Sequence, residues 1–200
     1  MTMLQSRPWS PPPVVRPESE PPAPERTDIR PGSAQDLEAM TTFLSGLSAE
    51  TLYKRFLTGL GQVMPPGLPR QLLVPGATGG SLLAVRGAAV IGHAMWAPVP
   101  TADDPSGAST VEIALVVADD HQGQGLGSRL VDALVDDVSG HGFAHVHAVV
   151  SAENHVVRRM ITRRVSDARY GRDGALITVT ADARSLAPRR SWPRGASTAR

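Results

Sequence analysis

The chain has 200 residues, of which 41% are hydrophobic, and its formal net charge is +1. This length suits one domain with tails, and the near-neutral charge gives no electrostatic argument for nucleic-acid binding. Cysteine is absent, which excludes disulfides, thiolate metal sites and a cysteine nucleophile. No apolar run reaches the ~20 residues of a membrane helix and no signal-peptide core is present, so a cytoplasmic protein without membrane contact is expected.

Both ends of the chain are predicted to lie outside the folded domain. Residues 1–26 contain eight prolines, which exclude a helix or the interior of a sheet and predict a disordered tail. Residues 185–200 form a second flexible tail by composition. The domain is therefore predicted to span residues 27–184.

The first half of the domain reads as a strand, two helices and a hairpin. The first strand stops at Pro31, and Ser33 is predicted to cap the helix that follows. A second helix is predicted over residues 48–57, and residues 68–80 read as a linker. Strands at 81–86 and 88–97 are joined by a turn at Gly87, and residues 98–110 read as an exposed loop.

The second half is organised around a strand, a glycine loop and a long helix. An apolar strand over 111–117 leads to Gly123, Gly125 and Gly127, and leucines then recur every four residues from Leu126. Glycines let the backbone approach a ligand, and the first amides of a helix attract anions, so this unit predicts a phosphate site. The later elements are predicted as a strand at 143–150, a helix at 153–164 and strands at 169–171 and 175–181.

The spacing within the loop separates the classes of phosphate ligand. A Walker loop ends in Gly-Lys-Ser/Thr, but this loop has no lysine. A dinucleotide fingerprint reads G-x-G-x-x-G, whereas this loop reads G-x-G-x-G, and Asp136 and Asp137 fall inside the helix. The third pattern, Gln-x-x-Gly-x-Gly, fits Gln122, Gly125 and Gly127. A plain glycine-rich turn is the alternative.

The third pattern resembles motif A of the GNAT superfamily of acyl-CoA-dependent N-acetyltransferases. The order of predicted elements matches that family over residues 27–184 and is closest to bacterial Pat-type protein lysine acetyltransferases. Three segments carry the narrower similarity: residues 47–56, residues 112–120, and Asn154 with Met160 and residues 170–174. The resemblance implies an α/β (α+β) GNAT fold, with a mixed central sheet of about seven strands flanked by about four helices.

The resemblance also implies a binding site for acetyl-CoA. Its strand would pair with the pantetheine arm, its loop and first helical turn would hold the pyrophosphate, and a later asparagine would lie near the arm. An asparagine is also a common first residue of a helix, which is the alternative for that position. The implied residues are Leu115, Val116, Val117, Gln122, Gly123, Gln124, Gly125, Leu126, Gly127, Ser128 and Asn154.

Glu112 is the candidate catalytic residue. Acetyl transfer needs a neutral amine, and a lysine amine with a pKa of ~10.4 must lose a proton to a base. Glu112 is the charged residue within an apolar strand, and it matches the catalytic glutamate of Pat-type enzymes. A half-exposed, salt-bridged glutamate is the alternative. Ile161 stands where many family members have a tyrosine, so no general acid is assigned.

No metal site is expected. His145 and His147 share a strand face, yet no acidic or thiolate partner lies nearby in the sequence. Arg158, Arg159, Arg163 and Arg164 either reach the ribose phosphate of coenzyme A or form the solvated face of a helix.

The sequence therefore predicts transfer of an acetyl group from acetyl-CoA to an amine, with a protein lysine as the favoured acceptor. Acetylation of a small amine or antibiotic is the first alternative. A non-catalytic acyl-CoA sensor is the second, and a nicotinamide dehydrogenase is the third. The acceptor, the acyl chain length and the oligomeric state are left open.

Overall fold

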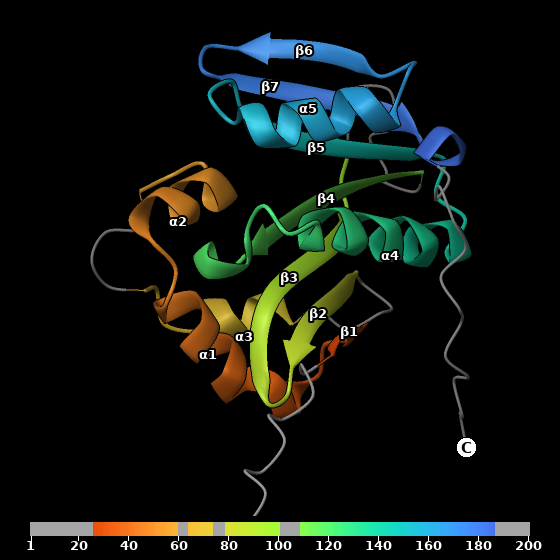
Figure 1. The fold of residues 1–200 in the computed structure, drawn as a ribbon. Helices are drawn as coiled ribbons and strands as arrows, with labels where there is room; N and C mark the ends of the chain where they lie inside the picture. Colours follow the sequence, from red (N-terminus) through yellow and green to blue (C-terminus); the bar gives the residue numbers. More distant parts are fainter. Residues whose placement is uncertain (1–25, 60–63, 74–78, 101–108, 187–200) are drawn as a thin grey trace, which may run out of the picture.

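The computed structural model describes residues 26–59, 64–73, 79–100 and 109–186, which form one mixed sheet flanked by helices (Figure 1). The seven strands lie in the order β1-β2-β3-β4-β5-β7-β6, and only the β4–β5 pair is parallel. The predicted mixed sheet is therefore confirmed. The strands are β1 (Thr27–Pro31), β2 (Gly80–Arg86), β3 (Ala89–Pro98), β4 (Thr110–Val117), β5 (His145–Ser151), β6 (Arg169–Asp173) and β7 (Leu176–Asp182).

The described residues contain five α-helices and three short 3₁₀ turns. No helix among them is long and apolar enough to cross a membrane. The helices are α1 (Leu37–Ser45), α2 (Ala49–Phe56), α3 (Leu68–Leu72), α4 (Leu126–Gly140) and α5 (His155–Arg164), and the turns are η1 (Ala34–Asp36), η2 (Asp119–His121) and η3 (Ala183–Leu186).

Two expectations need correction. The prediction of a linker over 68–80 is wrong for its first part, because α3 begins at Leu68 and buries Leu72. Its five residues are too few to show a helical period in the sequence. Leu186, assigned to the C-terminal tail, packs against the core beside α4. The predicted loop at 101–108 and the rest of both tails lie outside the described residues.

The core has two parts, one on each face of the sheet. On one face, Leu130, Leu134 and Val138 of α4 pack over strands β2 to β5. On the other face, Met40 and Leu44 of α1 pack with α3 against β2, β3 and β4. Successive side chains of β4 point to opposite faces of the sheet, so Val117 faces α4 while its neighbour Val116 faces α1.

The start of the domain is held by a buried carboxylate. Asp36 accepts hydrogen bonds from Ser33 N at 2.8 Å and from two nitrogens of Arg30 at 3.0 and 2.6 Å. The hydrogen bond from Arg30 is the largest cause that lowers the pKa of Asp36 far below its usual value; burial opposes it, and Ser33 adds to the lowering.

We expect this carboxylate to make stability depend on acid. A group with a lowered folded-state pKa stabilises the fold above its unfolded value of ~3.9, and this contribution is lost as the pH falls below that value. The melting temperature of Asp36→Asn should therefore lie below that of the wild type at pH 7, and the difference should shrink as the pH is lowered towards 2. Thermal unfolding across this range measures it. A constant difference would show that the charge of Asp36 contributes nothing.

Candidate functional site

Strands β4 and β5 separate shortly after they meet. Their ladder joins only Thr110–Glu112 to His145–His147, although β4 continues to Val117 and β5 to Ser151. The outer edges of both strands are occupied by β3 and β7. Beyond Glu112, the facing edges of β4 and β5 therefore have no strand partner among the described residues.

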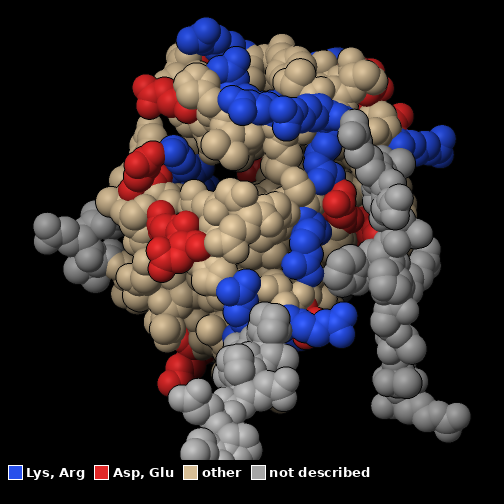
Figure 2. All heavy atoms as spheres, in the orientation of Figure 1, with Lys and Arg blue, Asp and Glu red and all other residues tan. Residues whose placement is uncertain are grey.

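A cavity of about 110 Å³ lies in this gap. Its walls are mostly apolar, and they include residues that face α4 as well as residues of α2. The space-filling view shows a hollow between α5 and α4 on the near face (Figure 2). The lining residues include Lys54, Arg55, Ile113, Ala114, Leu115, Val131, Ala148, Val149, Val150, Asn154, Val157, Met160, Ile161 and Arg164.

The glycine loop follows β4 and leads into α4. Gly123 and Gly125 have φ values of 72° and 81°, a left-handed conformation that favours glycine. The backbone amides of residues 123–128 have no hydrogen-bond acceptor among the described residues, and α4 begins without a side-chain cap. Unpaired amides at the positive end of a 15-residue helix form an anion site.

The two glutamines of the loop brace it through their side chains. The Gln122 Nε2 donates to the Val117 carbonyl at 3.1 Å and to the Thr51 hydroxyl at 3.2 Å. The Gln124 Nε2 donates to the Asp120 carbonyl at 2.8 Å. These hydrogen bonds hold both side chains against the protein, and the backbone amide of Gln124 has no acceptor among the described residues.

The other predicted cofactor residues lie at different depths. Leu115 and Asn154 line the cavity, and Asn154 also caps α5, because its Oδ1 accepts from Val157 N at 3.2 Å. Ser128 lies beside α5, with its hydroxyl 3.9 Å from the sulfur of Met160. The side chains of Val116, Val117 and Leu126 are buried in the core and cannot contact a ligand in the gap. For these three, only the backbone fits the predicted role.

Asp119 joins the glycine loop to α2. It accepts from Ser48 N at 3.0 Å, from the Ser48 hydroxyl at 2.8 Å and from the Thr51 hydroxyl at 2.7 Å. Burial alone would raise the pKa of Asp119, but these hydrogen bonds outweigh burial and lower the pKa, so the carboxylate stays charged. Helix α2 is thereby fixed beside the loop, and α2 carries Arg55 towards the gap.

Glu112 is the last paired residue before the strands separate. It is half-buried, and the alternation along β4 places it on the side opposite α4, which it shares with Val116 and α2. Arg55 interacts with it electrostatically: burial lowers the pKa of Arg55 to about 10, and the charge of Glu112 opposes that shift. His147 is its partner across the ladder, with Nδ1 3.1 Å from the Thr180 hydroxyl.

Sequence reasoning did not anticipate Arg55 and His147 at this position. The spacing between Arg55 and Glu112 carries no local pattern, because the two residues come together only through the packing of α2 on β4. For His147, a metal site was weighed against an ordinary strand histidine, and the second was favoured. Its register with Glu112 could have been found from the parallel pairing of the two strands.

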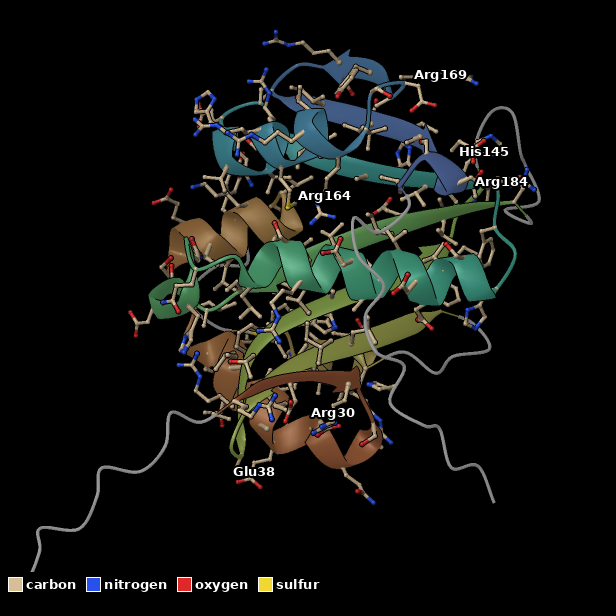
Figure 3. The ribbon with its side chains drawn as sticks, turned by 45° about the vertical axis from the view of Figure 1, so that its right-hand side comes forward. Arg30, Glu38, His145, Arg164, Arg169 and Arg184 are labelled. Carbon is tan, nitrogen blue, oxygen red and sulfur yellow. The ribbon has the colours of Figure 1, made fainter. Side chains whose placement is uncertain are left out.

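Arg164 connects α5 to α4. It forms an ion pair with Asp132 and also donates to the Ser128 carbonyl at 3.0 Å (Figure 3). This bridge closes one side of the gap. Arg158 instead donates to the Ala152 carbonyl at 3.0 Å and lies outside the gap.

His93 is not a candidate catalytic group. His93 is fully buried, and burial, followed by the charge of Arg55, lowers its pKa to about 3, so it is neutral at pH 7. Its Nε2 lies 3.1 Å from the Leu72 carbonyl. The described residues contain no group of three or more His, Asp or Glu side chains placed to hold a metal ion.

The site combines two parallel strands that separate after a short ladder with a loop of unpaired backbone amides. The profile of the acetyltransferase (GNAT) family matches residues 50–165, more than half of the chain. The chain therefore belongs to the GNAT family. No curated protein matches the chain at a significant level.

Solved structures share the fold. The GNAT domain of S. lividans PAT aligns with a TM-score of 0.69 and 19% identity over 82% of this chain and 99% of that one. Salmonella typhimurium yncA, solved with its cofactor acetyl-CoA, aligns with a TM-score of 0.59 and 20% identity over 78% and 94%. A cAMP-binding acyltransferase from Mycobacterium smegmatis aligns with a TM-score of 0.50 and 27% identity over 78% and 43%. The predicted GNAT fold is confirmed.

Proposed function

We propose that this protein transfers an acetyl group from acetyl-CoA to the amine of a protein lysine, with Glu112 as the general base. One observation carries the proposal: Glu112 lies where β4 and β5 separate, on the side opposite α4 and beside the cavity wall formed by Ile113 and Ala114. Membership of the GNAT family supports acetyl-CoA as the acyl donor.

The residues present fit coenzyme A. The unpaired amides of residues 123–128 would hold its pyrophosphate, and the free edge of β4 beyond Glu112 would pair with the amides of the pantetheine arm. The apolar walls suit the rest of the arm, because they exclude water from the thioester. The protein thus supplies orientation, while the cofactor supplies the reactive acyl group.

The reaction removes two protons from the acceptor nitrogen, one before it attacks the thioester and one after. Glu112 takes a proton from the ammonium group, directly or through a water. The amine lone pair then forms the N–C bond at the thioester carbonyl, and the C–S bond breaks as the coenzyme leaves as a thiolate. The second proton of the acceptor nitrogen passes to this thiolate, directly or through water, which leaves a neutral amide and a free thiol. Arg55 helps the first step, because a nearby cation lowers the pKa of an amine and favours its neutral form.

The choice of a protein lysine rests on the three segments that resemble Pat-type enzymes, and on the linear side chain of lysine, which suits a narrow apolar passage. A second candidate is a small amine that carries a carboxylate. Lys54 and Arg55 both line the cavity and would bind that carboxylate while Glu112 binds the amine. Incubation with labelled acetyl-CoA, a set of lysine-containing proteins and a set of amino acids distinguishes the two, because label appears on only one class.

We expect acetyl-CoA and CoA to raise the melting temperature, and NAD to leave it nearly unchanged. A ligand at 100 times its dissociation constant stabilises the folded state by about 2.7 kcal/mol, which is several degrees for a domain of this size. The glycine loop lacks the dinucleotide spacing, so NAD should not reach this occupancy. Thermal-shift measurements with each ligand test the expectation, and stabilisation by NAD alone would overturn the proposed function.

A non-catalytic sensor of acyl-CoA would also pass that test. This candidate is favoured by one observation: neither of the two tyrosines lines the cavity, and Ile161 takes the place of the family's general acid. A protein that binds acetyl-CoA but acetylates neither acceptor class would be a sensor.

A further inference from the structure

A groove of about 670 Å³ lies between α5 and the outer strands of the sheet, apart from the gap between β4 and β5. Basic side chains gather over α5 on the near face of the molecule (Figure 2). The groove is lined by His155, Arg158, Arg159, Ile161, Thr162, Tyr170, Gly171, Arg172, Ile177 and Val179.

The floor of the groove is apolar and its rim is basic. The β6–β7 register pairs Tyr170 with Val179 and Arg172 with Ile177, so these side chains share the sheet face that α5 covers. Tyr170 is 56% exposed although it lies over apolar neighbours. Asp173 alternates to the opposite face, and Glu153 precedes α5, so neither lines the groove.

The arginines of the groove have no carboxylate partner among the described residues. Arg158 donates to the Ala152 carbonyl at 3.0 Å, and Arg172 donates to the Gly174 carbonyl at 3.1 Å. The ion pairs between described side chains involve Arg30, Lys54, His141 and Arg164, and none involves Arg158, Arg159 or Arg172. Three positive charges thus face one groove without compensation.

Strand β6 is an open edge of the sheet. It is last in the strand order, it pairs only with β7, and all five of its residues are exposed. It contains no proline that would block pairing. Such an edge presents backbone donors and acceptors to which an extended chain can add as a further strand. Arg169 projects from this upper edge (Figure 3).

We propose that this groove binds an extended acidic segment of a partner protein, which adds to β6 as an edge strand. Its carboxylates pair with Arg158, Arg159 and Arg172, and an apolar side chain packs on Tyr170. The charges disfavour a second copy of this chain, because its own Arg169 and Arg172 would meet the same arginines. This docking function goes beyond acetyl transfer and does not depend on Glu112.

The test uses the full chain and a fluorescein-labelled peptide with glutamate and valine in turn at every second position and threonine between them, so that glutamate and valine share one face of the strand. Fluorescence anisotropy should show saturable binding that weakens as salt is added, since the ion pairs are partly screened. The same peptide with lysine in place of glutamate should not bind. A glutamate–valine peptide that is N-methylated at alternate amides should lose binding, because the backbone pairing with β6 is removed.

Charge reversal locates the site. We expect Arg158→Glu combined with Arg172→Glu to weaken peptide binding by about tenfold or more. Arg159→Glu alone is a second variant, because no hydrogen bond in the described residues would be lost with its guanidinium. Arg70→Glu, an exposed arginine on α3 without an ion pair among the described residues, is the matched control. Far-UV circular dichroism and the melting temperature should be similar for all four proteins, which shows that the fold is intact.

Three results would overturn the proposal. Unchanged peptide affinity in the reversed variants would place the peptide elsewhere. Tighter binding of a single-stranded oligonucleotide than of the acidic peptide would assign the groove to nucleic acid. A dimer that light scattering detects in the wild type, and that Arg172→Glu dissociates, would assign β6 to self-association.

Discussion

Replacing Glu112 by glutamine should lower the rate of acetyl transfer by about 10²–10⁴-fold, the usual contribution of a positioned general base. Glutamine keeps the shape of the side chain but cannot accept the proton. Binding of CoA should persist, because Glu112 lies on the side of the sheet opposite the glycine loop helix. Initial rates and isothermal titration of the purified variant measure the two effects separately.

The pH dependence of the variant gives the control. Part of the lost rate should return at alkaline pH, where more of the acceptor amine is neutral. His147 is the other titratable side chain that the β4–β5 ladder places beside Glu112, so His147→Gln should retain most of the wild-type rate. A Glu112→Gln enzyme with the wild-type rate at pH 7, or a His147→Gln enzyme with the larger loss, would refute Glu112 as the base. Joint loss of folding and CoA binding would make Glu112 structural.

Replacing Gly125 by valine should abolish most of the affinity for CoA. A Cβ at this position meets no atom within 4 Å, so the side chain would project into open space, where the pyrophosphate is proposed to bind. The φ of 81° adds strain of about 1–3 kcal/mol for a residue with a side chain. The expected result is a folded protein that acetyl-CoA no longer stabilises.

Gly142 provides a matched control for the strain. Its φ is 80°, a Cβ there also meets nothing within 4 Å, and it lies just beyond the opposite end of α4. Gly142→Val should therefore lose a similar amount of stability and keep the full affinity for CoA. If both valine variants bind CoA equally, the glycine loop is not part of the site. Gly127→Ala further separates backbone strain from loss of space for the ligand. A Cβ at this position makes only ordinary contacts with Leu115 and Val117, at 3.8 and 3.9 Å, so this variant should keep both its stability and its affinity for CoA.

The sequence was sufficient for the elements that have a long period or a strong boundary signal. Helix α4 begins at Leu126, where its leucine repeat begins, and Ser48 caps α2 with its hydroxyl accepting from Thr51 N at 3.2 Å. Helix α3 was missed, because five residues with a proline at the start carry no repeat. Strand ends shifted by one or two residues where pairing with β7 rather than composition decides them.

The candidate site was only partly accessible from the sequence. The loop and Glu112 belong to one continuous stretch, so a motif could identify them. The gap between β4 and β5 has no such motif, because it depends on where two distant strands stop pairing. The same holds for Asp119, whose three hydrogen bonds reach residues about seventy positions away in the chain. Side chains such as Gln122, which brace the loop, cannot be distinguished from ligand contacts by spacing alone.

The short ladder between β4 and β5 divides the sheet into two parts that are joined by few backbone hydrogen bonds. Strands β1 to β4 form one antiparallel part and β5 to β7 form the other, and the ladder between the two parts consists of three residue pairs. Helix α4 and the Arg164–Asp132 ion pair also connect the two parts of the sheet. A ligand that binds to the glycine loop of the first part and to the cavity walls formed by both parts therefore holds the two parts together. Binding of the ligand should therefore slow the exchange of backbone amide hydrogens most at residues 110–112 and 145–147, away from the loop atoms that the ligand contacts.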